Sequence, residues 1–181
     1  MADRKPAEVN NGRLRQIYDA YRSALLNRKY YGCQLDSYRK MNRASDIVLA
    51  IATPGMVGAW AIWHSQTGQL LWGVIASSVS LLAVVKPIFN WSKEIDRYSR
   101  LHAAHTVQFY TLKQLVDDIE IEGGITVAME KRFNESRAQN TQLAKDDDVR
   151  PNKRLSIRCE KEVLREIPSD RLWVPEEGET S

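Results

Sequence analysis

The feature that most constrains this chain is a long stretch without fixed charge. From Ile47 to Val85 the sequence contains no Asp, Glu, Lys or Arg. A helix needs about 20 apolar residues to cross a hydrocarbon core, whereas a core helix of a globular domain seldom needs more than about 14. The stretch holds two spanning lengths in succession, and it begins too far along the chain to be a signal peptide. It therefore predicts a membrane hairpin of two helices.

Lysine and arginine residues lie near the two outer ends of the predicted hairpin but not in the turn that joins its helices. The predicted spans cover residues 44–63 and 70–89, and the polar turn between them, residues 64–69, contains neither Lys nor Arg. Basic residues gather shortly before the first span and shortly after the second: Arg28, Lys29, Arg39, Lys40 and Arg43, then Lys86, Lys93, Arg97 and Arg100. Because positively charged flanks stay in the cytoplasm, we expect both termini on the cytoplasmic side.

A few polar side chains lie within the predicted spans. Thr53 precedes Pro54, which should kink the first span, and Ser77 and Ser80 are one helical turn apart in the second. Thr53, Ser77 and Ser80 could line a polar conduit if several subunits surround an axis. The serines could equally bond backbone carbonyls in a packed hairpin that has no pore. The spacing leaves both interpretations open.

Helical periodicity continues on both sides of the hairpin. One seam, with spacings of three and four, consists of Leu14, Ile17, Tyr21, Ala24, Arg28, Tyr31, Leu35, Tyr38 and Asn42. The other consists of Ile95, Tyr98, His102, His105, Phe109, Leu112, Val116 and Ile119. These seams predict two long helices that pair with each other and with copies in neighbouring subunits. The expected fold class is all-α, a membrane hairpin with two cytoplasmic helical extensions, assembled as a homo-oligomer.

The domain organisation follows from these patterns. We assign residues 1–12 to an N-terminal tail, 13–43 to a cytoplasmic helix, 44–89 to the hairpin, 90–145 to a cytoplasmic helical region and 146–181 to a linker and C-terminal tail. Within the helical region, Gly123–Gly124 should end one helix before a second begins near residue 125. The run Asp146–Asp148 is typical of a solvated linker. One short amphipathic helix is expected at residues 160–167.

No residue pattern predicts an enzyme or a bound cofactor. There is no nucleophile-elbow context, no glycine-rich phosphate loop and no zinc spacing. His102 and His105 are three residues apart, a spacing that suits a shared metal or a pH switch. Without acidic or thiol ligands at helical spacing, a pair of hydrogen-bonded seam histidines is the simpler interpretation. Cys33 and Cys159 are expected to be ordinary thiols.

Tyrosines and cations alternate along both predicted cytoplasmic helices. Aromatic rings that stack on bases and cations that bind phosphates are what a single-stranded nucleic-acid ligand requires. The candidate ligand residues are Arg22, Lys29, Tyr30, Arg97 and Arg100. The alternative is amphipathic packing combined with attraction of cations near the membrane to anionic lipid. The residue pattern by itself favours that alternative.

The plan of the chain resembles the SLATT family of two-transmembrane effectors in bacterial conflict systems. The segments that carry the likeness are DAYRSALLNRKYYGCQLDSYRK, the hairpin of residues 44–89, and WSKEIDRYSRLHAAHTVQFYTLKQLVDDIE. The resemblance implies a channel-forming antiphage effector in the bacterial inner membrane, encoded beside a nucleotidyltransferase. In the similar Hailong-type arrangement, a tetrameric channel is held shut by a DNA oligomer that the partner enzyme makes.

Two functions of different classes are consistent with these patterns. The first is an oligomeric channel that is gated by a nucleotide or oligonucleotide, depolarises the membrane and arrests growth. The second is a non-conducting membrane anchor that recruits a cytoplasmic partner through its heptad helices. Liposome ion flux would distinguish them, because only the first predicts conduction.

Overall fold

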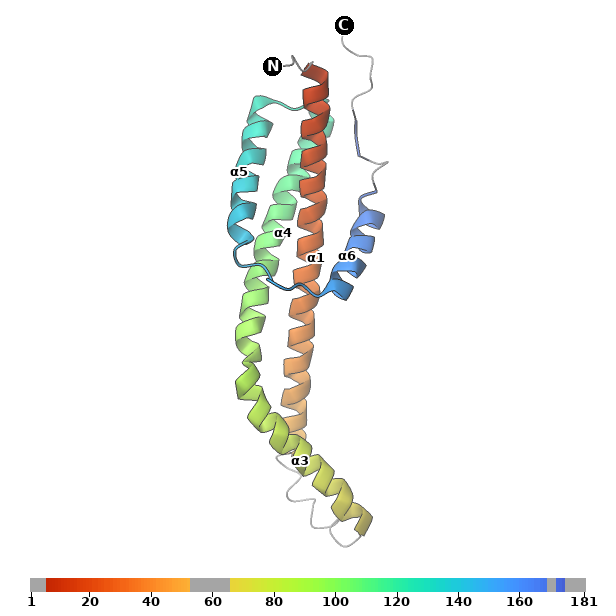
Figure 1. The fold of residues 1–181 in the computed structure, drawn as a ribbon, viewed down its shortest axis with the longest axis vertical. Coiled ribbons are helices and arrows are strands. Elements are labelled where there is room, and N and C mark those ends of the chain that lie inside the picture. The colour runs from red at the N-terminus through yellow and green to blue at the C-terminus, as the bar shows by residue number, and fades with distance from the viewer. Residues whose placement is uncertain (1–5, 53–65, 169–171, 175–181) are drawn as a thin grey trace. The chain divides into compact units, whose positions relative to one another are not determined.

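The computed structural model describes residues 6–52, 66–168 and 172–174. Within those ranges the chain is helical and contains no strand, so the prediction of an all-α fold is confirmed at that level (Figure 1). The helices are α1 (Pro6–Ala52), α3 (Gln66–Phe89), α4 (Trp91–Glu122), α5 (Val127–Leu143) and α6 (Lys153–Glu166). Thr53, Pro54 and the rest of residues 53–65 lie outside the described residues.

The chain divides into two compact units. The first, here called the head unit, consists of residues 1–32 and 99–181, and the second, the hairpin unit, consists of residues 33–98. Helices α1 and α4 each contribute one part to the head unit and another part to the hairpin unit.

Helix α1 is longer than its sequence pattern suggested. It begins at Pro6, so most of the segment predicted to be an N-terminal tail, residues 1–12, is helical. Proline suits a helix start because its missing N–H would have no intrahelical partner there. Asn-Asn-Gly at residues 10–12 lowers helix propensity by less than about 1 kcal/mol per residue, and burial of Leu14 and Ile17 in the following turn offsets that cost.

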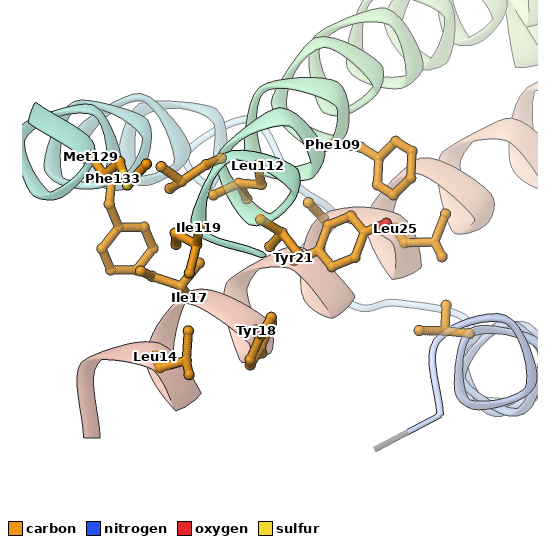
Figure 2. Packing of buried hydrophobic residues seen from close by; sticks show 14 residues of the cluster. Leu14, Ile17, Tyr18, Tyr21, Leu25, Phe109, Leu112, Ile119, Met129 and Phe133 are labelled. Carbon is orange, nitrogen blue, oxygen red and sulfur yellow. The ribbon is translucent and has the colours of Figure 1, made fainter. Parts of the chain in front are cut away.

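The core of the head unit joins α1, α4 and α5, with one side chain, Val163, from α6. Its buried side chains include Leu14, Ile17, Tyr21 and Leu25 of α1, Phe109, Leu112, Val116 and Ile119 of α4, and Met129 and Phe133 of α5. Figure 2 shows these side chains gathered into one cluster. The rings of Tyr21 and Phe109 stack with centroids 5.3 Å apart. The prediction that the seams of the two long helices pair within one chain is confirmed here.

The junction between α4 and α5 follows the predicted signal. Helix α4 ends at Glu122, and Gly123 takes a positive φ of 67°, a conformation that costs glycine little because it has no Cβ. The side chain of Thr126 then accepts a hydrogen bond from the Met129 N–H and caps the start of α5.

The C-terminal region is more ordered than the predicted linker and tail. Helix α6 covers the 14 residues Lys153–Glu166, so it begins seven residues before the expected start at residue 160, and it buries Cys159 and Val163. Leu155, Cys159, Val163 and Ile167 are spaced four apart and give the helix a narrow apolar stripe. Charged residues surround this stripe and obscured it in the sequence pattern.

The hairpin unit brings the ends of α1 and α3 together. Asp46 near the end of α1 forms an ion pair with Lys86 near the end of α3, and the rings of Tyr38 and Tyr98 stack with centroids 5.1 Å apart. Residues 66–69, predicted to belong to the turn of the hairpin, form the first turn of α3. No helix in the described ranges is both long enough and apolar enough to cross a membrane.

Candidate ligand surface

Three of the five predicted ligand residues lie together on α1 in the head unit. Arg22 and Lys29 are seven residues apart, which places them on one side of the helix, and Tyr30 is adjacent to Lys29. All three contact residues of one region, here called the C-terminal segment, which consists of the described residues 147–168 and 172–174. Helix α6 is its regular part and lies beside α1 (Figure 1).

Arg22 has a partly satisfied guanidinium group. Its Nε donates a hydrogen bond of 3.2 Å to the backbone carbonyl of Ile167. Its Nη2 is buried and has no hydrogen-bond partner among the described residues. A buried donor without an acceptor is costly, so this nitrogen is available to an anion placed against α1.

Lys29 is held by two acidic residues of α6. Its Nζ lies 2.5 Å from a carboxylate oxygen of Glu166 and 3.5 Å from one of Glu162. The hydrogen bond to Glu166 raises the pKa of Lys29 against the opposing effect of its partial burial. The ammonium group is therefore charged and already paired with carboxylates at neutral pH.

Tyr30 and Tyr31 bind the start of the C-terminal segment. The Tyr30 hydroxyl donates to a carboxylate oxygen of Asp148 at 3.0 Å and accepts from the Asn152 N–H at 3.0 Å. The Tyr31 hydroxyl donates to Asp147 at 2.8 Å and accepts from the Asp148 N–H at 3.2 Å. The expectation that the aspartate run is a solvated linker is therefore wrong for Asp147 and Asp148.

His105 belongs to the same cluster, whereas His102 does not. The fully buried ring of His105 stacks on Tyr31 at 5.0 Å, and its Nε2 lies 3.0 Å from Asp147. The Nδ1 of His102 lies 3.1 Å from the Arg28 carbonyl, to which it can donate. The two histidines thus have separate partners. Among the described residues, no group of three or more His, Cys, Asp or Glu could hold a metal ion.

Tyr18 extends the contact toward the N-terminus of α1. Its hydroxyl donates a 2.8 Å hydrogen bond to the Trp173 carbonyl. Burial raises the pKa of Tyr18 to about 12, with a smaller contribution from the negative charge of Glu120. Tyr18, Arg22, Lys29, Tyr30 and Tyr31 together form what we call the α1 face.

Arg97 and Arg100 are the other two predicted ligand residues. Arg97 belongs to the hairpin unit, where it pairs with Glu94 at 3.6 Å and lies over the ring of Tyr98. Arg100 is an exposed residue of α4 in the head unit. The structure does not bring Arg100 to the α1 face. The predicted five-residue site is thus represented by three residues.

The acidic residues that contact the α1 face were not predicted from the sequence. Asp147, Asp148, Glu162 and Glu166 supply the carboxylates that meet the α1 face. The four-residue spacing of the apolar stripe in α6 was the available signal, because it indicates which side of that helix packs inward.

The predicted conduit residues are described only in α3. The Ser77 hydroxyl donates to the Gly73 carbonyl at 2.7 Å, the backbone bond expected of a packed hairpin, and Ser80 is exposed. Thr53 lies outside the described residues.

Comparison with protein-family models, with curated proteins and with solved structures finds no match to this chain.

Proposed function

We propose that this chain is an oligomeric channel effector of the bacterial inner membrane, gated by a nucleotide or oligonucleotide that binds the head unit. On this proposal the stretch Ile47–Val85 forms the membrane hairpin, four copies surround the conduit as the SLATT resemblance implies, and opening depolarises the cell. The ligand is made by a partner nucleotidyltransferase.

The observation that carries the proposal is the ion pair at the ends of the uncharged stretch. Asp46 and Lys86 are the charged residues that directly precede and follow it, and they pair with each other. The two ends of the stretch therefore lie side by side, as a hairpin that enters and leaves a bilayer at one surface requires. Hydrocarbon accommodates such an uncharged stretch as two helices, because each helix satisfies its own backbone hydrogen bonds.

The α1 face supports an anionic ligand in the head unit. It combines two cations, one of which has a buried donor without a partner in the described ranges, with tyrosine hydroxyls. Guanidinium and ammonium groups form strong charge-assisted bonds to phosphate oxygens. A ligand that binds one packing of α1 and α4 better than another shifts the equilibrium between closed and open channels by that difference in affinity.

The test is ion flux through liposomes that contain the purified full chain. We expect flux from the wild type and none from Leu81→Lys, because a lysine in the middle of a span costs about 2.5–3.5 kcal/mol. Leu81 is an exposed residue of α3. The matched control is Val127→Lys, which adds the same charge at an exposed position of α5 in the head unit. Equal flux from both variants, or none from the wild type in either the presence or absence of nucleotide, would refute the proposal.

A non-conducting membrane anchor is the second candidate, and the Ser77 hydrogen bond favours it. A hydroxyl that bonds its own helix at Gly73 is not needed to line a conduit. The anchor predicts that Ser77→Ala and Ser80→Ala leave every measurable activity unchanged and that the chain recruits a partner without flux. The channel predicts altered conductance in at least one of these variants.

A further inference from the structure

The C-terminal segment covers the α1 face along its whole length. Its contacts progress from Tyr30 and Tyr31, which bind Asp147–Asn152, through Lys29, which binds α6, to Tyr18, which binds Trp173. The segment therefore runs antiparallel to α1, and α6 lies beside α1 in Figure 1. The residues that we propose for the ligand are the residues that this segment occupies.

The groups that the segment presents are those that a phosphate ligand would present. Carboxylates of Glu162 and Glu166 meet the Lys29 ammonium group, and a carboxylate of Asp148 accepts from the Tyr30 hydroxyl. A carbonyl oxygen accepts from the Arg22 guanidinium group. Phosphate oxygens accept hydrogen bonds from the same donors. A donor that is bound to the segment cannot bind a phosphate at the same time.

Helix α6 adds one side chain, Val163, to the core cluster, and Ile167, Leu172 and Trp173 of the C-terminal segment pack against that cluster. The helix buries two side chains, Cys159 and Val163, while Ile157 and Leu164 stay about half exposed. Its acidic partners for Lys29 are themselves exposed, at 42% for Glu162 and 53% for Glu166. Exposed ion pairs contribute little individually and are screened by salt. Release of the segment removes these ion pairs and the apolar contacts of Val163, and it leaves contacts between α1 and α4 such as the Tyr21–Phe109 ring stack in place.

We infer that residues 147–168, with residues 172–174, form an autoinhibitory strap. The strap acts as an internal acidic stand-in for the ligand, and a polyphosphate or nucleic-acid anion displaces it from the α1 face. The inference rests on the proposed function for the location of the ligand. It adds that binding of the anion and attachment of the strap to the α1 face exclude each other. The anion then competes with a tethered acidic segment, so its apparent affinity is lower than the intrinsic affinity of the bare face.

The experiment compares Glu162→Gln/Glu166→Gln with Glu135→Gln/Glu160→Gln in the purified full chain. Both pairs remove two exposed negative charges, but Glu135 and Glu160 form no hydrogen bond or ion pair with α1 among the described residues. Binding is measured by fluorescence anisotropy with labelled oligothymidylate and, separately, by competition with inorganic polyphosphate. Strap release is measured by hydrogen exchange of the amides of residues 153–167.

We expect the Glu162/Glu166 variant to bind the polyanions about three- to tenfold more tightly than the wild type, and the control variant to match the wild type. Saturating polyanion should accelerate exchange in residues 153–167 of the wild type, while exchange in α5 stays unchanged. Both results support the strap.

The outcomes separate the strap from the proposed function. Release by polyphosphate but not by oligothymidylate leaves the strap standing and refutes a nucleic-acid ligand. Binding of either polyanion without faster exchange overturns the strap and leaves the proposed ligand site intact. Equal affinities for the two double variants, or no binding of either anion to any of the three proteins, also overturns it.

Discussion

Replacing Tyr31 with phenylalanine isolates the hydroxyl that binds the first residues of the strap. The ring of Tyr31 stacks on His105 at 5.0 Å with an interplanar angle of 3°, and phenylalanine preserves that contact. The change removes a 2.8 Å bond to Asp147 and the acceptor of the Asp148 N–H. The change therefore weakens the attachment of residues 147–148.

The structure sets the size of the effect. A hydrogen bond to a charged acceptor contributes about 1.5–3 kcal/mol. Asp147 is 29% exposed and keeps its contact with His105 at 3.0 Å, so water and the imidazole compensate in part. We expect the loss at the low end, about 1.5 kcal/mol, which corresponds to roughly tenfold faster exchange of the amides that this attachment protects.

The assay is native-state hydrogen exchange of the Asp148, Ser156 and Ile167 amides, compared with amides in α5. The control is Tyr110→Phe, because Tyr110 is an exposed residue of α4. A double-mutant cycle with Asp147→Asn should give a coupling energy of at least about 0.5 kcal/mol. Exchange within twofold of the wild type, or strict additivity of the two changes, would show that the Tyr31–Asp147 bond does not hold the strap.

Three further predictions concern the head unit. Phe133→Ala should lower the free energy of unfolding by about 3–5 kcal/mol, since Phe133 is 1% exposed in the core shown in Figure 2; a loss below about 1 kcal/mol in thermal unfolding followed by circular dichroism would contradict this packing. Burial, and to a smaller extent the charge of Glu120, raises the pKa of Tyr18 to about 12. The folded state therefore keeps a proton that the unfolded state loses above pH 10, so the free energy of unfolding falls from pH 10 to 12 by up to about 1.4 kcal/mol per pH unit. Urea unfolding should show a shallower fall in Tyr18→Phe. Gly32→Ala would place a Cβ 3.1 Å from the ring of His102. The gain in the free energy of unfolding from better helix propensity, about 1 kcal/mol, should therefore appear in full only in the His102→Ala background. Equal gains in both backgrounds would argue against the close approach.

Local signals in the sequence were sufficient for several elements. The seam of α4 predicted its buried residues because one side of a helix packs inward throughout its length, and Tyr98, His105 and Phe109 are all buried. The end of α4 was predictable because Gly123 adopts a positive φ at little cost. In contrast, the helical start of α1 at Pro6 was not predicted, since weak local propensity there is overcome by packing of the turns that follow.

The candidate site, too, could be predicted only in part. Arg22, Lys29 and Tyr30 could be chosen from their residue types, and helix periodicity implied that the two cations share a side of α1. Their acidic partners could not be found in this way, because Lys29 and Glu166 are 137 residues apart in sequence. No periodicity within α1 carries information about a contact with a distant segment.

Patterns within a few helical turns were enough to identify the two long helices, the inward side of each and the uncharged stretch between Asp46 and Lys86. The pairing of Asp46 with Lys86 and the contact of the C-terminal segment with the α1 face became visible only in the folded chain. The physical reason is that ion pairs and hydrogen bonds act over a few ångströms in space, and folding alone brings distant residues within that range.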